Sequence, residues 1–126
     1  MELWVKVGRK KKKLQGSMKS VMESLLREAE GKKTVELLSF HASQKERRRL
    51  KRELRANGKD LLRTASSLVR WFYLTELRKV RREIKRLRKR AMYLSKGDTL
   101  YRTDAMEEIR KLEERSKHIQ ERIKEL

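Results

Sequence analysis

The 126-residue chain contains no cysteine and no proline, and it has only five glycines. Without cysteine, the chain cannot form disulfides, thiolate metal sites or cysteine nucleophiles. Without proline, the commonest helix breaker is missing, and the glycines at positions 8, 16, 31, 58 and 97 punctuate the chain at fairly regular intervals. We interpret the glycines as ends of helices and predict an all-α protein of extended helices.

Long apolar runs are also missing, since no window approaches the roughly 18 to 20 apolar residues that a membrane span needs. The N-terminus reaches its first basic run without the apolar core of a signal peptide. These two absences predict a soluble intracellular protein with no membrane partner.

Residue patterns that carry chemistry are equally scarce. The two histidines, His41 and His118, are far apart, and neither has the spacing of a metal ligand. The sequence contains no phosphate-binding glycine loop, no nucleophile elbow and no paired carboxylates. We therefore expect no metal, no cofactor and no enzymatic activity.

Charge, in contrast, is abundant and strongly one-sided. Lysine and arginine number 37 against 18 acids, which gives a formal net charge of +19, and charged residues outnumber apolar ones by 44% to 37%. The length allows at most one modest domain, and self-repulsion at this charge favours a polyanionic partner. Helices with narrow apolar seams suit such a lean apolar content.

Residues 1–16 are interpreted as a basic N-terminal arm. Trp4 lies in an apolar alternation from Leu3 to Val7 that is too short to define a strand, and we expect the indole to serve packing or a partner. Five successive cations follow: Arg9, Lys10, Lys11, Lys12 and Lys13. Such a run is typical of a nuclear localisation signal, a disordered phosphate-binding arm or a soluble tail, and the residues do not choose among the three.

Residues 17–58 are predicted to form amphipathic and basic helices. Ser17 is a candidate N-cap for a short amphipathic helix, and Gly31 is a candidate stop. Apolar residues at positions 35, 37, 38 and 40 then predict a further helical turn, which Thr34 could cap.

A second basic helix is predicted from about residue 45 to residue 56. Ser43 and Glu46 match the capping box that opens helices, and Asn57 with Gly58 is a typical break. Six cations of this helix form a candidate phosphate-binding patch: Arg47, Arg48, Arg49, Lys51, Arg52 and Arg55.

Residues 59–126 are predicted to form a long helix followed by an antiparallel C-terminal helix. Asp60 is the candidate cap of the first helix, and Asp104 with Glu107 is the candidate capping pair of the second. The apolar seam of the first helix is Tyr73, Leu77, Val80, Ile84, Leu87, Ala91 and Leu94. The seam of the second is Ala105, Ile109, Leu112, Ser116, Ile119, Ile123 and Leu126. The two seams match in length, which predicts a coiled-coil-like antiparallel helical hairpin.

The most strongly charged segment lies on the first helix of this hairpin. Nine cations surround a single acid, Glu83: Arg78, Lys79, Arg81, Arg82, Lys85, Arg86, Arg88, Lys89 and Arg90. A solvated helix face usually mixes charges of both signs, because like charges four residues apart repel. The nearly uniform sign therefore predicts phosphate binding. The six arginines favour structured RNA over duplex DNA, because guanidinium groups form bidentate hydrogen bonds with phosphates and stack on exposed bases.

Three successive aromatic residues precede the basic segment. On a helix, Trp71, Phe72 and Tyr73 point in directions about 100° apart, so they cannot all be buried. Phe72 and Tyr73 fit the apolar stripes, whereas Trp71 is left to pack on the N-terminal helix, to contact a partner or to stack on a base.

The element Val69-Arg70-Trp71-Phe72, followed by the strongly basic helix Thr75 to Arg90 and a further charged helix, resembles the exit-from-G1 family of rRNA-processing proteins. In that family a Val-Arg-Phe-Phe-like element precedes a lysine- and arginine-rich helix. The resemblance covers about residues 45–120 and departs from the pattern at Trp71. It implies a scaffold without activity of its own, working with pre-rRNA and assembly factors on early small-subunit precursors in the nucleolus.

We therefore expect a non-enzymatic RNA-binding structural protein of a ribonucleoprotein, with protein partners in that particle. Two alternatives stay open at this point. One is a helical subunit that joins other proteins through its seam, and the other is a DNA-binding or viral packaging protein that binds phosphate without reading sequence. A homodimer is a further open alternative, because seams of this kind also pair between chains.

Overall fold

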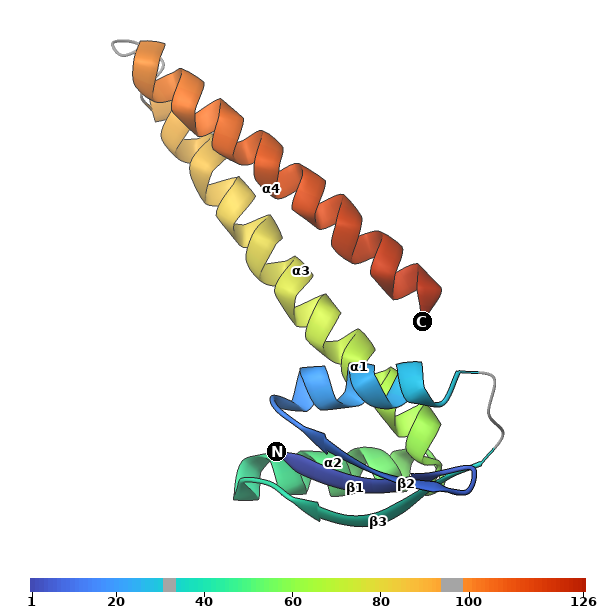
Figure 1. Cartoon of the computed structure of the whole chain (residues 1–126). Coiled ribbons are helices and arrows are strands. Elements are labelled where there is room, and N and C mark those ends of the chain that lie inside the picture. Colours follow the sequence, from blue (N-terminus) through green and yellow to red (C-terminus); the bar gives the residue numbers. More distant parts are fainter. Residues whose placement is uncertain (31–33, 94–98) are drawn as a thin grey trace. The chain divides into compact units, whose positions relative to one another are not determined.

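The computed structural model of the chain describes residues 1–30, 34–93 and 99–126. It divides into two compact units, Met1–Trp71 and Phe72–Leu126. The elements follow in the order β1, β2, α1, β3, α2, α3 and α4 (Figure 1). Among the described residues, no helix has the length and apolar character needed to cross a membrane.

The first unit contains a three-stranded antiparallel sheet. Its strands are β1 (Glu2–Val7), β2 (Lys10–Gln15) and β3 (Val35–His41), in the spatial order β2-β1-β3. β1 and β2 form a hairpin whose turn includes Gly8 at φ 62°, a left-handed conformation that glycine adopts without strain. Leu3, Val5 and Val7 point to one face and are fully buried, which fixes the register of the central strand.

The prediction of an all-α protein is therefore wrong, and the fold is α+β. The expected basic arm forms the β1 and β2 hairpin, and the helical turn expected near residues 35–40 is β3. A register irregularity in the β1 and β3 pairing, between Trp4 and Val5, explains the misleading spacing. The extra residue places the partly buried Val35, Leu37 and Phe40 at intervals of two and three, which a helix also produces.

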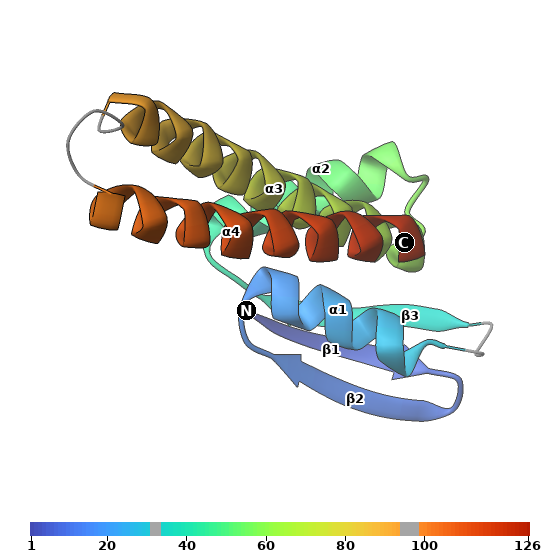
Figure 2. The same cartoon turned by 90° about the horizontal axis from the view of Figure 1, so that it is seen from above.

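Helix α1 (Met18–Glu28) packs against β1 and β2 on the buried face of the sheet (Figures 1 and 2). The predicted cap is confirmed, because the Ser17 side chain accepts a hydrogen bond from the Ser20 backbone amide. Met18, Val21, Met22 and Leu25 are buried and form the helix side of this core. The proposed stop at Gly31 lies outside the described residues.

Helix α2 (Gln44–Ala56) begins with the predicted capping box, which is confirmed. The Ser43 hydroxyl accepts from the Glu46 amide, while the Glu46 carboxylate accepts from the Ser43 amide. The helix ends at Asn57, and Gly58 follows at φ 62°. Leu50 is the fully buried residue of α2.

Helix α3 (Leu61–Tyr93) starts at the predicted cap. The Asp60 carboxylate accepts hydrogen bonds from the backbone amides of Leu62 and Arg63. The part of α3 that belongs to the first unit completes its core with Leu61, Thr64, Ala65, Leu68 and Val69, all buried. The Thr64 hydroxyl is satisfied by donating to the Asp60 carbonyl.

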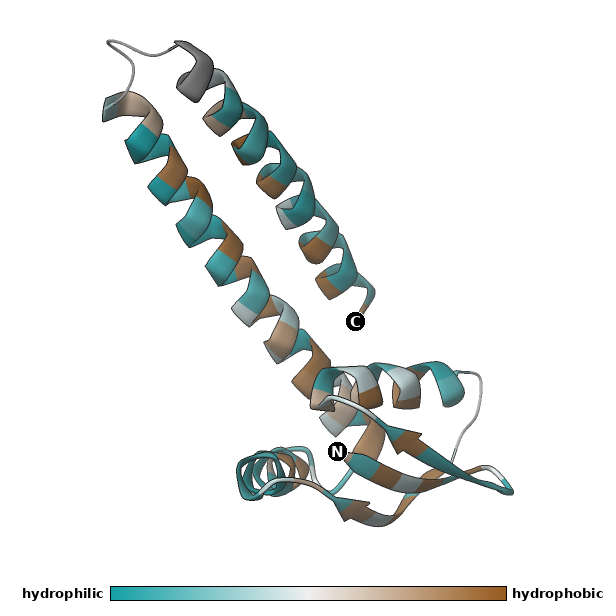
Figure 3. Cartoon of the chain, turned by 60° about the vertical axis from the view of Figure 1, so that its left-hand side comes forward, coloured by the Kyte–Doolittle hydropathy of each residue, from teal (hydrophilic) through white to brown (hydrophobic). Residues whose placement is uncertain are grey.

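The second unit is a hairpin of α3 with the antiparallel helix α4 (Thr99–Glu125). In Figure 3, the ribbon segments of the apolar residues, drawn in brown, run along the side of each helix that faces the other. Tyr73, Leu77, Val80, Ile84 and Leu87 are buried on α3, and Ala105, Ile109 and Ile119 are buried on α4. The antiparallel pairing expected from the two seams is therefore present, and burial of these side chains stabilises it.

The start of α4 differs from the prediction. The helix begins at Thr99, so Asp104 and Glu107 lie inside it and do not cap it. The polar residues of this segment favour turns, but local preferences of this kind are weak against helix continuation. The predicted seam position Leu94 lies outside the described residues.

Candidate nucleic-acid interface

The nine cations between residues 78 and 90 all lie on the solvent side of the α3 and α4 hairpin. This set, called the α3 basic face, comprises Arg78, Lys79, Arg81, Arg82, Lys85, Arg86, Arg88, Lys89 and Arg90, and every member is exposed. The seam residues between them are buried against α4. Burial of the seam thus leaves every cation of the segment facing water.

The hairpin's own acids neutralise only a small part of this face. Within the described residues, ion pairs reach two of the nine cations: Arg86 with Glu83 at 2.5 Å and Arg88 with Glu113 at 2.6 Å. The hydrogen bond that Arg86 donates to the Glu83 carboxylate, together with the negative charge of that carboxylate, raises the pKa of Arg86 above its ordinary value. Both pairs are solvent-exposed, so water and salt screen them and either cation can exchange its carboxylate partner for a phosphate.

A second group of cations lies on α2. This α2 basic patch consists of Arg47, Arg48, Arg49, Lys51, Arg52 and Arg55, of which all but Arg49 are exposed. Two of its guanidinium groups lie over aromatic rings, Arg47 at 5.6 Å from the Phe40 centroid and Arg49 at 3.6 Å from the Trp71 centroid. The predicted patch therefore exists as a surface, although part of it is anchored on aromatic side chains.

The N-terminal cations do not form one continuous basic surface. Arg9 lies in the hairpin turn, and the four lysines of β2 alternate between the two faces of the sheet. Lys12 pairs with Glu28 of α1, while Lys13 pairs with Glu2 at 3.3 Å. Strand geometry thus divides a run that looks uniform in the sequence.

The two tryptophans are both partly exposed. Trp4 is 39% exposed on the sheet face opposite the core, and the Lys13 ammonium lies 5.6 Å from its ring centroid. Trp71 is 40% exposed and carries the Arg49 guanidinium. Stacking of Arg49 on Trp71 is a role that the sequence analysis missed, because it requires α2 and α3 to be placed in three dimensions.

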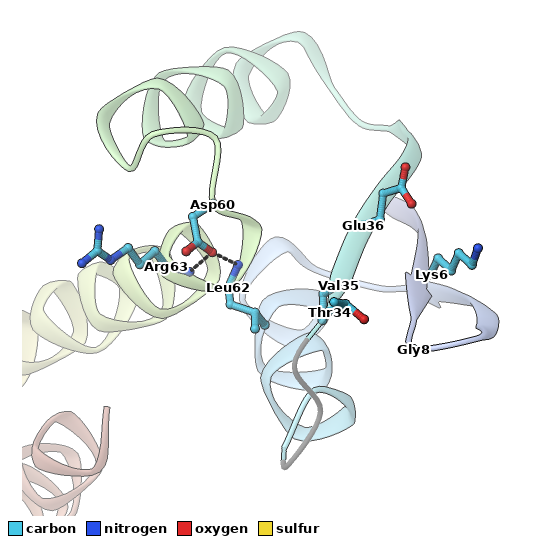
Figure 4. A pocket seen from close by; sticks show the side chains of 8 residues that line it. All are labelled: Lys6, Gly8, Thr34, Val35, Glu36, Asp60, Leu62 and Arg63. Atoms are coloured by element: carbon cyan, nitrogen blue, oxygen red, sulfur yellow. Dashed lines mark hydrogen bonds between the residues drawn. The ribbon is translucent and has the colours of Figure 1, made fainter.

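A hollow of about 550 Å³ lies between the sheet and the start of α3 (Figure 4). Its charged lining is balanced, with Lys6 and Arg63 against Glu36 and Asp60. Asp60 is already engaged in capping α3, as Figure 4 shows. This balance makes the hollow a poor site for a polyanion.

A second hollow, of about 470 Å³, runs along α2 and has a different character. It is lined by Gln44, Lys45, Arg48, Arg49 and Arg52, with no acid among them. Gln44 and Lys45 were not among the predicted site residues. The signal for Lys45 was its spacing of four residues from Arg49, which places both on one side of the helix.

Metal binding has no evident site in the described ranges. There, no three histidine, aspartate or glutamate side chains come close enough together to hold a metal ion. His118 lies 3.9 Å from Glu121 on α4, and both side chains are exposed.

Comparison with known proteins leaves the chemistry of the site open. No protein-family model matches the chain, so the resemblance to the exit-from-G1 family stays a prediction, and no solved structure matches it. A protein of Aquifex aeolicus (strain VF5), described as an uncharacterized protein, is 52% identical over 126 residues, covering 100% of this chain and 98% of that protein. The chain belongs to the same family as this Aquifex aeolicus protein.

Proposed function

We propose that the protein binds RNA through the α3 basic face and acts as a non-enzymatic structural component of a ribonucleoprotein. The observation that supports this most is that all nine cations of the α3 basic face are exposed, while the seam residues between them, Val80, Ile84 and Leu87, are buried. The segment Arg78 to Arg90 extends over roughly 20 Å, enough to contact several phosphates.

The charge of this face favours a polyanion over a helical protein partner. A partner helix would need an apolar surface to pack against, and the seam of α3 is already covered by α4. The face itself offers long cationic side chains, which are hydrated individually and repel one another until a polyanion neutralises them. Phosphate oxygens provide that neutralisation and release counter-ions on binding.

The preference for RNA rests on arginine. Six of the nine cations are arginines, and the planar guanidinium group binds a phosphate with two parallel hydrogen bonds and also stacks on unpaired bases. Structured RNA presents both features, whereas duplex DNA hides its bases in the stack.

A finer proposal concerns the particle. A role in rRNA processing and small-subunit ribosome assembly, with protein partners in that particle, rests on the resemblance of about residues 45–120 to the exit-from-G1 family. Cross-linking the protein to nucleic acid in cells, followed by sequencing of the attached molecules, tests this directly. Enrichment of precursor rRNA supports the finer proposal, and its absence from the cross-linked RNA contradicts it.

Charge reversal tests the binding surface. The variant carries glutamate at Arg81, Arg82, Arg86 and Lys89. The matched control carries glutamate at four cations that are also exposed, on α4: Lys111, Lys117, Arg122 and Lys124. Both variants change the net charge by the same amount. Binding is measured by fluorescence anisotropy with a labelled RNA stem-loop, and the helix content by circular dichroism.

We expect the α3 variant to lose RNA affinity by about a hundredfold or more, because four phosphate contacts become repulsive. The α4 control should lose much less, since only the long-range attraction changes. Equal losses in the two variants would show that net charge, and not the α3 basic face, drives binding. Equal affinity of the wild type for the RNA stem-loop and for duplex DNA of the same length would favour the DNA alternative.

A further inference from the structure

The hollow on α2 differs from the rest of the basic surface because its cations converge. Lys45, Arg48, Arg49 and Arg52 line it together with the amide of Gln44, and all five belong to one side of α2. Four positive side chains around one shallow space create a local potential that a single anionic group can satisfy.

Neither acid of α2, Glu46 or Glu53, lines this space, and both accept hydrogen bonds from other groups. The Glu46 carboxylate accepts from the backbone amide and from the hydroxyl of Ser43, at 3.2 and 2.8 Å, as part of the capping box. The Glu53 carboxylate accepts from the Ser67 hydroxyl of α3 at 3.3 Å. The helix thus keeps its own carboxylates away from the hollow, and the positive charge there has no internal counter-ion from α2.

Arg49 is held in place by an aromatic ring. Its guanidinium carbon lies 3.6 Å from the centroid of the Trp71 ring, a close cation–π contact between α2 and α3 within the first unit. A guanidinium group stacked in this way still has its N–H groups at the edges for hydrogen bonding. Because the side chain is already ordered, it loses less conformational entropy when it binds an anion than a free arginine does.

We propose that this hollow is a binding site for one backbone phosphate of the bound nucleic acid. The guanidinium group of Arg49, which Trp71 positions, is the bidentate hydrogen-bond donor to that phosphate. Lys45, Arg48 and Arg52 supply the surrounding charge, and the Gln44 amide provides a neutral donor. The inference rests on the proposed function, because the phosphate belongs to the same RNA. It adds a second, preorganised contact point on the first unit.

The test uses two substitutions that leave the apolar core and most charges intact. Arg49→Lys keeps the positive charge but removes the planar fork, and Trp71→Leu keeps an apolar side chain but removes the ring under Arg49. Arg63→Lys is the matched control, since Arg63 is an exposed arginine of the same unit that does not line the hollow on α2. Thermal unfolding and circular dichroism check that each full-length variant is folded.

Binding to the labelled RNA stem-loop should weaken by about tenfold in Arg49→Lys, because a bidentate charged hydrogen-bond pair is replaced by a point charge. Trp71→Leu should lose a similar factor. The double variant should lose no more than either single variant, because Trp71 acts through Arg49. Arg63→Lys should change the affinity by less than about twofold.

Several results would contradict the proposed phosphate-binding site on α2. One is an Arg49→Lys affinity equal to that of Arg63→Lys, and another is a double variant whose loss equals the product of the two single losses. A third measurement is the affinity of the variants for inorganic pyrophosphate. If Arg49→Lys weakens pyrophosphate binding but leaves RNA affinity unchanged, the hollow binds free phosphate and not the RNA backbone. None of these outcomes changes the result expected from charge reversal on α3. Failure of the proposed phosphate-binding site on α2 is therefore distinguishable from failure of the proposed function.

Discussion

The substitution Leu87→Ala tests whether burial of the seam holds the α3 and α4 hairpin closed. Leu87 is only 6% exposed, and removal of a buried leucine side chain costs about 2 to 5 kcal/mol depending on how far the site can collapse. A seam between two helices borders water on both sides and can relax, so we expect a loss of about 2 kcal/mol, near the lower limit. This loss corresponds to a roughly thirtyfold larger population of opened hairpin.

Hydrogen exchange followed by mass spectrometry measures this opening in the amides of α4. The matched control is Met106→Ala, because Met106 is an apolar residue of the same hairpin that is 57% exposed, and its truncation should cost less than about 0.5 kcal/mol. We expect faster exchange across α4 in Leu87→Ala and nearly unchanged exchange in the control. Equal exchange in the two variants would refute the idea that the apolar seam stabilises the hairpin.

Two further predictions concern the ends of α2. Ser43→Ala should destabilise the protein by about 1 kcal/mol, because the capping box is lost. The hydrogen bond from Ser43 lowers the pKa of Glu46 below its ordinary value of 4.5, so this contribution is complete above about pH 4.5 and disappears as the pH falls through the lower, folded-state pKa. Unfolding midpoints measured across acidic pH should therefore fall less steeply in Ser43→Ala than in the wild type, and parallel pH profiles would contradict this. Gly58→Ala should cost about 1 kcal/mol in urea unfolding, because Gly58 has a φ of 62° that an alanine adopts only with strain, and an unchanged stability would show that the turn relaxes freely.

Local chemistry made the helix caps predictable from the sequence. Ser17, Ser43 with Glu46, and Asp60 cap helices as expected, because each interaction spans only two or three residues. The hairpin seams were predictable for a related reason, since the burial pattern repeats regularly over many turns. Where the polar signal was weaker, at Asp104, helix continuation prevailed.

The sheet was not predictable in the same way. β1 is only six residues long, and its alternation of Leu3, Val5 and Val7 gives a weak signal. β2 consists largely of lysines, and β3 pairs with β1 across a sequence separation of 28 to 39 residues, with an irregularity that hides its alternation. Strand pairing depends on such distant contacts, which a local pattern does not contain.

The candidate interface likewise contains features that the sequence predicts and features that it does not. Exposure of the α3 cations followed from the position of the seam, which the sequence reveals. The stacking of Arg49 on Trp71 depends on the packing of α2 against α3. Lys45, Arg48 and Arg52, in contrast, share one side of α2 because of helical spacing alone. Arg9 to Lys13 look like one basic patch in the sequence, but the structure divides them between a turn and the two faces of the sheet.

The salt dependence of RNA binding tests the central claim most directly, namely that the exposed cations of the α3 basic face bind phosphates. Within the described residues, seven of its nine cations make no ion pair with the protein's own acids. If each of them contacts one phosphate, the logarithm of the affinity should fall against the logarithm of the salt concentration with a slope of about −5 to −6. A slope between zero and about −1 would contradict the account, because binding would then proceed without the release of counter-ions.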